Sequence, residues 1–303
     1  MESFSELTII IPTFYPGPII KKCIKSLPVT ADIIIVDNSH DEELRNTLNE
    51  ENYNIRYYNV GDIGLPRSFN FALTKARNND ILITQPDVEF TNNAIKELIA
   101  ASKKYENIGL LAPLVYENNK YSIYDSLDLK LSKNGKIKSE KKNKKNNKIP
   151  SGDFCVEAVN ATAMLLKKNI ILGVGGWDEN IYTYLEDLDL CIRLRKESMS
   201  LIKVHSSIVH HIGFGSHKVE NKNQLELSRN WHFCWSSLYF RQKYYSNSHF
   251  IFYYLKVFFK YLIKSLLNLT LLKFKKSKKN FFRFRACINY LTIKKSNFRI
   301  RLK

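Results

Sequence analysis

The stretch that decides the fold is Ile81-Leu82-Ile83-Thr84-Gln85-Pro86-Asp87. Its first four residues predict a buried strand, and such strands carry their last residues to a sheet edge, where α/β proteins bind ligands. Pro86 cannot donate a hydrogen bond to a neighbouring strand, so we expect pairing to stop there and Asp87 to point into open space. A carboxylate in that position suits Mg²⁺ or Mn²⁺, which in turn bind phosphate oxygens. It can equally serve to turn the chain, and this stretch alone does not decide between the two.

Short apolar runs alternate with helical patterns on the N-terminal side of this stretch. Runs at residues 7–11, 32–36 and 55–58 predict three strands, and apolar residues at helical spacing lie between them. This alternation is typical of a mostly parallel sheet with helices on its faces. With 303 residues, of which 44% are hydrophobic, the chain can bury one large core or two modest ones.

Thr13 and Asp37 follow two of these predicted strands at the same edge of the sheet. Asp37 can accept hydrogen bonds from a ribose or a base edge, or it can cap the helix that begins near Asp41. The chain has neither G-x-G-x-x-G nor a P-loop motif, so any nucleotide binds without a glycine-rich cradle. Arg67 lies in the first turn of a further predicted helix. A cation there is explained either by a bound diphosphate or by solvation.

The sequence Leu185-Glu186-Asp187-Leu188-Asp189 places three carboxylates at the start of another predicted helix. We expect Asp189 to pair with Arg193, one turn later, on the helix surface. Glu186 and Asp187 lie near the positive end of the helix dipole, which keeps a carboxylate ionised. They are candidates for a base that deprotonates a sugar hydroxyl, and the simpler alternative is that they only cap the helix.

Two more strands are predicted in this half of the chain. One is long, from Val156 to Leu166, and the other ends at the adjacent His210 and His211. Alternation places the two imidazoles on opposite faces, so one can complete a metal site while the other is structural. The lysine-rich stretch at residues 133–148 has almost no apolar side chains and is predicted to be a solvated loop.

Charge and cysteine content narrow the possible partners. The 47 Lys and Arg residues outnumber 29 Asp and Glu, which gives a net charge of +18 and a pI near 9.5. This favours anionic partners such as nucleic acid, an acidic membrane surface or phosphorylated substrates. The five cysteines show no C-x-x-C spacing, which indicates reduced thiols rather than disulfides or a zinc site. The first six residues lack a basic stretch and an apolar core, so no signal peptide is expected.

The C-terminal segment is different in kind. Residues 251–272 are apolar, but Lys256, Lys260, Lys264 and Asn268 recur at every fourth position. Three lysines argue against a membrane-spanning helix. We expect an amphipathic helix in the plane of a membrane surface, reinforced by the basic residues that follow it. The alternative is a helix packed on the rest of the protein.

In their order and spacing, these motifs resemble family 2 glycosyltransferases, in particular the rhamnosyltransferase-like branch of bacterial surface polysaccharide synthesis. The resemblance covers roughly residues 7–245. The motifs are I-P-T at 11–13, V-D-N-S at 36–39, D-I-G-L-P-R at 62–67 with Asn70 after it, Q-P-D at 85–87, G-G-W-D-E at 175–179, L-E-D-L-D-L-C-I-R at 185–193 and H-x-x-G at 210–213. Three positions depart from the usual pattern: Gln85 replaces an acid or Asn, Asp62 replaces Asn, and Asn160 replaces a common Gly.

The resemblance implies a GT-A fold, an α/β architecture with a Rossmann-like, mixed and mostly parallel sheet flanked by helices. Residues 1–220 would form the catalytic domain, with the nucleotide-binding half up to about residue 90 and the acceptor, metal and base half at 91–220. Residues 221–303 would form a helical, amphipathic and basic extension that contacts the membrane surface.

The resemblance also implies the roles of single residues. Asp187 would be the catalytic base, and Asp87 would hold Mg²⁺ or Mn²⁺ together with His211, which matches the family's histidine better than His210. The residues that would bind the nucleotide sugar are Pro12, Thr13, Asp37, Gly64, Arg67 and Gln85. Those on the acceptor side would be Asn160, Trp177 and Glu186.

The function implied is an inverting, metal-dependent glycosyltransferase on the cytoplasmic face of the inner membrane. It would move a sugar from TDP-rhamnose or a UDP-sugar to a saccharide or lipid-linked saccharide acceptor in O-antigen, capsule or lipooligosaccharide synthesis. Two alternatives remain open. One is a catalytically silent membrane-surface protein of the same fold, because Gln85 leaves the Q-P-D motif with a single carboxylate. The other is a nucleic-acid-binding protein, which the net positive charge favours although no nucleic-acid-binding motif is present.

Overall fold

The computed structural model describes residues 3–49, 53–118, 120–122, 127–132, 135–142, 149–212, 222–292 and 296. The chain forms two compact units. The sheet unit comprises Met1–Leu129, Ser139–Trp177 and Asp187–Lys218, and the helical unit comprises Lys130–Lys138, Asp178–Glu186 and Val219–Lys303. The expected division into functional domains near residue 220 stays a prediction, but the helical unit also takes up two shorter stretches from the first 220 residues.

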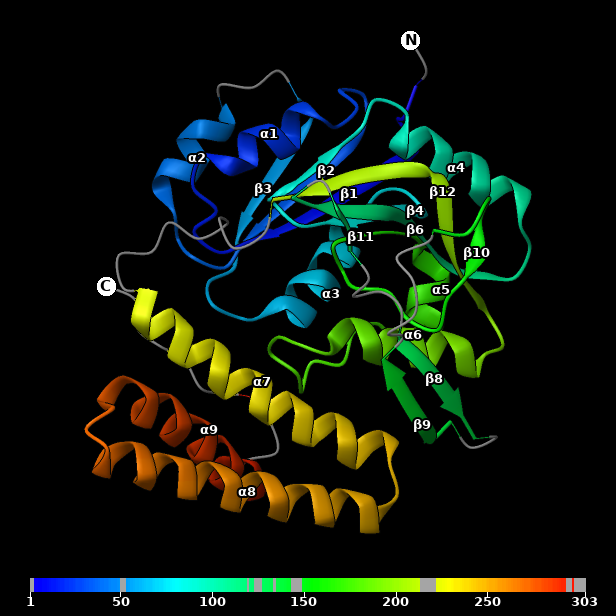
Figure 1. Ribbon diagram of the computed structural model, residues 1–303. Coiled ribbons are helices and arrows are strands. Elements are labelled where there is room, and N and C mark those ends of the chain that lie inside the picture. The colour runs from blue at the N-terminus through cyan, green and yellow to red at the C-terminus, as the bar shows by residue number, and fades with distance from the viewer. Residues whose placement is uncertain are drawn as a thin grey trace. The chain divides into compact units, whose positions relative to one another are not determined.

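A ten-stranded mixed sheet forms the centre of the sheet unit (Figure 1). Its strands are β1 (Leu7–Thr13), β2 (Asp32–Asp37), β3 (Ile55–Asn59), β4 (Asp80–Thr84), β5 (Val88–Phe90), β6 (Ile108–Glu117), β7 (Lys120–Tyr121), β10 (Phe154–Cys155), β11 (Ala163–Lys167) and β12 (Ser200–His211). The main order is β10-β12-β6-β11-β4-β1-β2-β3, while β5 pairs with β12 and β7 with β6. The three strands predicted before residue 60, and the strand that decides the fold, are therefore confirmed as β1 to β4.

Strand direction determines which side chains meet. Strands β1, β2, β3 and β4 are parallel, and β6 is parallel to β12. Strand β11 runs antiparallel to both β4 and β6, so β6 and β12 point the same way as β1 to β4. The carboxyl ends of six strands and the start of β11 consequently lie at one edge of the sheet.

Helices cover both faces of the sheet (Figure 1). They are α1 (Ile19–Lys25), α2 (Glu42–Asn49), α3 (Leu65–Lys75), α4 (Ala94–Lys104), α5 (Lys168–Gly173) and α6 (Glu186–Lys196). Buried residues of α1, α2 and α4 share one core cluster with alternate residues of β1 and β2, such as Ile9 and Ile33. Their neighbours Ile10 and Ile34 are also buried, on the other face. Burial on both faces explains why these strands read as continuous apolar runs.

Two expectations about regular structure were wrong. Residues 156–162 do not continue a long strand, because their backbone turns to side chains of α6: Val159 N–H contacts the Cys191 sulfur and Ala161 N–H donates to Asp187. Within the lysine-rich stretch, β9 (Ile137–Lys142) is a strand rather than a loop. Before this strand, Ser132 N–H donates to the Lys136 carbonyl, while residues 133–134 and 143–148 of the stretch lie outside the described part of the chain.

The helical unit contains α7 (Lys222–Tyr244), α8 (Asn247–Thr270) and α9 (Phe274–Thr292). Its core joins Trp231, Trp235 and Leu238 of α7 to Ala286 and Tyr290 of α9. Helix α8 packs on both partners and begins at the cap Ser246, whose hydroxyl accepts from His249 N–H. None of the helices in the described ranges is long and apolar enough to cross a membrane.

Candidate active site

Asp37 organises the sheet edge at the end of β2. Its carboxylate is fully buried and accepts hydrogen bonds from Ser39 N–H at 2.9 Å, Asp41 N–H at 3.0 Å and the Tyr57 hydroxyl at 2.7 Å, while the Thr13 hydroxyl donates at 3.3 Å. Burial and the hydrogen bond to Asp37 raise the pKa of Tyr57, so this hydroxyl remains a donor. Asp37 therefore holds the turn that leads into α2. Its contact with a nucleoside stays a prediction.

The cap of α2 is Asp41, whose carboxylate accepts from Leu44 N–H at 3.1 Å. Tyr15, which the sequence analysis did not single out, lies at the same edge. Its backbone has a φ of 47° and its N–H donates to the Ser39 hydroxyl at 3.0 Å. Burial and the charges of Asp37 and Asp41 raise the pKa of Tyr15. An aromatic ring beside carboxylates suits a nucleoside, which offers a flat ring and hydroxyl donors.

Asn38 joins this edge to the start of α3. Its side-chain oxygen accepts from Gly64 N–H at 3.2 Å and from the Ser68 hydroxyl at 3.0 Å, and its amide donates to the Thr13 carbonyl at 3.3 Å. Gly64 is the N-cap of α3 with a φ of 88°, a conformation that favours glycine. The structure thereby brings Thr13 and Gly64 together, with Arg67 half-buried in the first turn of α3.

Gln85, Pro86 and Asp87 form a tight turn between β4 and β5. Val88 N–H closes it on the Gln85 carbonyl at 3.3 Å, and the Asp87 carbonyl accepts from Ile212 N–H at 3.0 Å at the end of β12. The structure confirms that β4 stops before Pro86, because β4 ends at Thr84. The expectation that Asp87 points into open space was wrong: its side chain is buried, because β5 begins at Val88 and pairs with β12 beside it.

The Asp87 carboxylate and the His211 imidazole face each other at this turn. Asp87 Oδ1 lies 3.5 Å from His211 Nε2, and His211 Nδ1 lies 3.0 Å from Glu117 Oε1 at the end of β6. His210 is exposed whereas His211 is half-buried, so the two imidazoles have different surroundings, as the alternation of side chains along a strand predicted. Burial alone lowers the pKa of His211, but hydrogen bonds and attraction to Asp87 and Glu117 outweigh it and leave this pKa above its usual value. Glu117 was missed, although it ends a strand at the same edge.

This pair fits a divalent cation in its chemistry. A carboxylate oxygen and an imidazole nitrogen are ligands for Mn²⁺, and a second carboxylate on the other ring nitrogen is a common way to orient a ligating histidine. Within the part of the chain that the structure describes, no three Asp, Glu, His or Cys side chains converge on one metal position.

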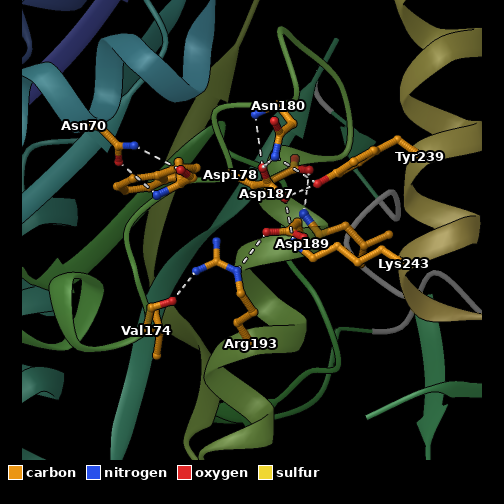
Figure 2. A network of polar contacts seen from close by, with 11 residues as sticks. Asn70, Val174, Asp178, Asn180, Asp187, Asp189, Arg193, Tyr239 and Lys243 are labelled. Atoms are coloured by element: carbon orange, nitrogen blue, oxygen red, sulfur yellow. Dashed lines mark hydrogen bonds and ion pairs between the residues drawn. The ribbon is translucent and has the colours of Figure 1, made fainter. Parts of the chain in front are cut away.

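The three carboxylates at the start of α6 have different surroundings. Asp187 is half-buried; Ala161 N–H donates to its Oδ2 at 3.1 Å and Leu188 N–H to its Oδ1 at 2.7 Å. Asp189 pairs with Arg193 at 2.8 Å, as predicted. The pair is not on the surface, however: Asp189 is fully buried, and Arg193 also donates to the Val174 carbonyl at 2.7 Å (Figure 2).

The residues predicted on the acceptor side are not equally accessible. Asn160 is exposed, whereas Trp177 and Glu186 are buried. The backbone of Trp177 is bracketed by the Asn70 amide, with its N–H donating to Asn70 Oδ1 and its carbonyl accepting from Asn70 Nδ2, both at 2.9 Å (Figure 2). Its ring centroid lies 4.8 Å from that of Phe69. The acceptor roles of these residues stay predictions.

Residues 8–163 match the model of the family described as glycosyl transferase family 2, which is more than half of the chain. The chain belongs to glycosyl transferase family 2. Two curated relatives agree with the resemblance to its rhamnosyltransferase-like branch. The low-salt glycan biosynthesis hexosyltransferase Agl10 of Haloferax volcanii is 21% identical over 203 residues, which span 65% of this chain and 64% of that relative. An N-acetylglucosaminyl-diphospho-decaprenol L-rhamnosyltransferase of Mycobacterium tuberculosis is 20% identical over 233 residues, 68% of this chain and 76% of the other.

Solved structures confirm the GT-A fold of this family 2 protein. The mannosyltransferase PcManGT of Pyrobaculum calidifontis, in complex with GDP-Man and Mn²⁺, aligns over 94% of this chain and 87% of its own, with a TM-score of 0.52 and 10% identity. GalNAc-T7 with UDP, GalNAc and Mn²⁺ aligns over 68% of this chain and 43% of its own, with a TM-score of 0.53 and 16% identity.

Gly176 should be intolerant of any side chain, because of both its backbone and its neighbour. Its φ is +68°, and an added Cβ would lie 2.8 Å from Asn70 Oδ1. Gly176→Ala should therefore cost about 1–2 kcal/mol for the left-handed backbone, plus the loss of the Asn70 bracket around Trp177. Chemical denaturation would measure this cost.

Two nearby glycines serve as controls for that variant. Gly175 has a φ of +87° with nothing within 4 Å of an added Cβ, so Gly175→Ala should show the backbone cost alone. Gly173 also has open space and no positive φ, so Gly173→Ala should be near neutral. Equal losses for Gly175→Ala and Gly176→Ala would show that the Asn70 bracket contributes nothing.

Proposed function

We propose that this family 2 protein is an inverting glycosyltransferase that transfers a sugar from a nucleotide-diphosphate sugar to a hydroxyl acceptor. The observation that carries the proposal is the pairing of Asp87 with His211, 3.5 Å apart, at the sheet edge that also holds Asp37 and Asp187. Strand direction brings Asp37, Asp87 and His211 to one edge, and Asp187 of α6 lies beside it, because Ala161 N–H, two residues before β11, donates to its carboxylate. Ligands of open α/β sheets bind at such an edge.

The donor would lie along the carboxyl ends of β1, β2 and β4. Thr13 and Asp37 would face the nucleoside together with Pro12 and Gly64. Gln85 would contact the nucleotide sugar from the start of the turn at residues 85–87, where the metal would bind. Asp87 and His211 would hold Mg²⁺ or Mn²⁺, which when bound stabilises negative charge on a leaving diphosphate. Arg67, in the first turn of α3, would add positive charge for the same oxygens.

Asp187 would act as the base. Ala161 N–H and Leu188 N–H, which donate to its two oxygens, orient the carboxylate, and its partial exposure leaves it accessible to an acceptor. Asp187 takes the proton of the acceptor hydroxyl while that oxygen attacks the anomeric carbon. The bond from this carbon to the diphosphate oxygen breaks on the opposite face, so the configuration inverts without a covalent sugar–enzyme intermediate.

The finer assignment follows the relatives. A rhamnosyltransferase and a hexosyltransferase among them support TDP-rhamnose or a UDP-sugar as donor, and a saccharide or lipid-linked saccharide as acceptor. Cell-surface polysaccharide synthesis on the cytoplasmic face of the inner membrane is the setting that we propose. A catalytically silent binding protein is the second candidate, because Gln85 leaves Asp87 as the single carboxylate in the turn at residues 85–87.

The helical unit would hold the enzyme at an anionic membrane surface. Eight large apolar residues of α8 are between 47% and 72% exposed, and five of these form one stripe, namely Phe252, Leu255, Phe259, Ile263 and Leu266. At 100° per residue they fall within an arc of roughly 80°. Exposed lysines at 256, 260 and 264 lie directly beside this arc. An apolar stripe next to lysines is the pattern of a helix that inserts shallowly among acidic lipids.

Loss of either proposed metal ligand should remove the effect of Mn²⁺ on nucleotide binding. Wild-type protein should gain thermal stability from UDP or TDP with Mn²⁺, by about 2.7 kcal/mol at a ligand concentration near 100 Kd. Asp87→Asn and His211→Gln should lose this gain. Glu89→Gln, which alters an exposed carboxylate two residues away, should keep it. A gain that persists in Asp87→Asn would exclude Asp87 as the ligand.

Replacement of the proposed base should affect turnover more than donor binding. Asp187→Asn should lower kcat by about 10²–10⁴-fold, because an amide cannot accept the proton. Donor affinity should change little. Glu186→Gln should keep near-normal turnover, whereas Asp189→Asn should mainly destabilise the protein, since it leaves Arg193 without its charged partner. Near-normal turnover in Asp187→Asn, together with loss of turnover in Glu186→Gln, would show that Glu186 rather than Asp187 is the base.

The apolar stripe of α8 should decide membrane binding. Full-length protein should sediment with vesicles that contain phosphatidylglycerol, and less with phosphatidylcholine alone. The double variant Phe259→Ser, Ile263→Ser should lose this binding without unfolding, because both side chains are exposed. Leu172→Ser, at an equally exposed leucine of α5, is the matched control and should sediment normally. Substitution is preferable to truncation, since α7 buries Trp231 and Trp235 against α9.

A further inference from the structure

The segment Asp178–Glu186 belongs to the helical unit, although the residues before and after it in the chain belong to the sheet unit. It begins directly after the G-G-W motif and ends one residue before Asp187. The contacts that hold this segment therefore determine how the chain enters α6 and where the proposed base, Asp187, lies.

A half-buried carboxylate, that of Asp178, attaches the start of the segment to α7. Asp178 Oδ2 accepts from the Lys243 ammonium at 2.7 Å and from the Tyr239 hydroxyl at 2.8 Å (Figure 2). Its other oxygen accepts from the backbone and side-chain amides of Asn180, at 3.1 Å and 2.9 Å. Burial alone raises the pKa of Asp178, but Lys243 and the other donors outweigh it and lower this pKa below its usual value.

The remainder of the segment contacts the same face of α7. The Thr183 carbonyl accepts from the Ser236 hydroxyl at 2.8 Å, and the Tyr182 ring stacks on His232 with centroids 4.2 Å apart. The α7 residues involved are His232, Ser236, Tyr239 and Lys243. Their spacing of four, three and four places them in one row along the helix. The segment thus lies along α7 in the opposite direction, held at both ends and in the middle.

The backbone after these contacts is strained. Tyr184 and Leu185 have φ values of 70° and 69°, two consecutive left-handed residues that are not glycine. Each costs about 1–2 kcal/mol, and such conformations persist only where surrounding contacts impose them. The chain then begins α6 at Glu186, and Asp187 follows. Tyr184 itself contacts Phe233 of α7, with ring centroids 5.6 Å apart.

We infer that the row His232, Ser236, Tyr239 and Lys243 on α7 is a positioning surface for Asp187, the proposed base. The most important contact of this surface is the ion pair between Asp178 and Lys243. These residues act on catalysis through the segment 178–186 and do not touch substrate. The inference rests on the proposed role of Asp187. It gives the helical unit a part in the reaction that is separate from membrane binding.

Hydrogen exchange of the full-length protein tests the positioning without any substrate. Lys243→Met should speed amide exchange in peptides that cover residues 180–190, while peptides from β1 to β4 stay unchanged, and Lys243→Arg should restore most of the protection. The control is Lys279→Met, which removes the α9 partner of Glu226 on the same helix α7. Unchanged exchange at 180–190 in Lys243→Met, or equal loosening of all three helices, would overturn the inference.

Turnover then separates positioning from simple packing. In release of TDP from TDP-rhamnose or UDP from UDP-glucose, Lys243→Met and Asp178→Asn should lower kcat by roughly 10²-fold with an unchanged KM for the donor. In the Asp187→Asn background the same changes should cost little more, because the base that they position is already absent. Fully additive losses would overturn the inference. If wild-type protein turned over no donor while exchange behaved as expected, the proposed function would fail and the positioning of the segment would stand.

Discussion

The buried carboxylate of Asp37 is the interaction on which the site depends most. A buried charge is stable only when hydrogen bonds replace the water that it has lost. Asp37 meets this requirement with donors from β1, from β3 and from the turn into α2, so three strands and one helix are fixed together at one edge. Asn38, the next residue, extends this connection to the start of α3. The positions of these elements around the proposed donor site therefore depend on the hydrogen bonds to the Asp37 carboxylate.

The carboxylates of this protein divide into two groups by their partners. Asp32 and Asp189 are buried against arginines, and removing one partner of such a pair would leave an uncompensated charge. Asp87 and Asp187 lie at the sheet edge with a histidine or backbone amides as neighbours instead. The surroundings of a carboxylate, rather than the residue type, therefore distinguish the two buried arginine pairs from the two carboxylates that we propose to act in catalysis.

The helical unit combines two surfaces on neighbouring helices. The row on α7 faces the segment that leads to Asp187, and the exposed stripe on α8 offers apolar side chains beside lysines. Both use the same regular spacing of helical residues. A helix can therefore carry packing on one side and a binding surface on another. In this unit the aromatic core around Trp235 keeps the two surfaces in a constant relation to each other.

The sequence by itself determined the alternation of strands and helices, the strand end at Pro86, the family, and the candidates Asp87, Asp187 and His211. These depend on local patterns, which short-range periodicity and turn chemistry reveal. Only the tertiary structure decided which carboxylates are buried, that Glu117 orients His211, and that residues 156–162 bond to α6 instead of extending a strand. It also decided that residues 178–186 join the helical unit. Each of these outcomes depends on contacts between residues far apart in the chain, and a local pattern carries no information about such partners.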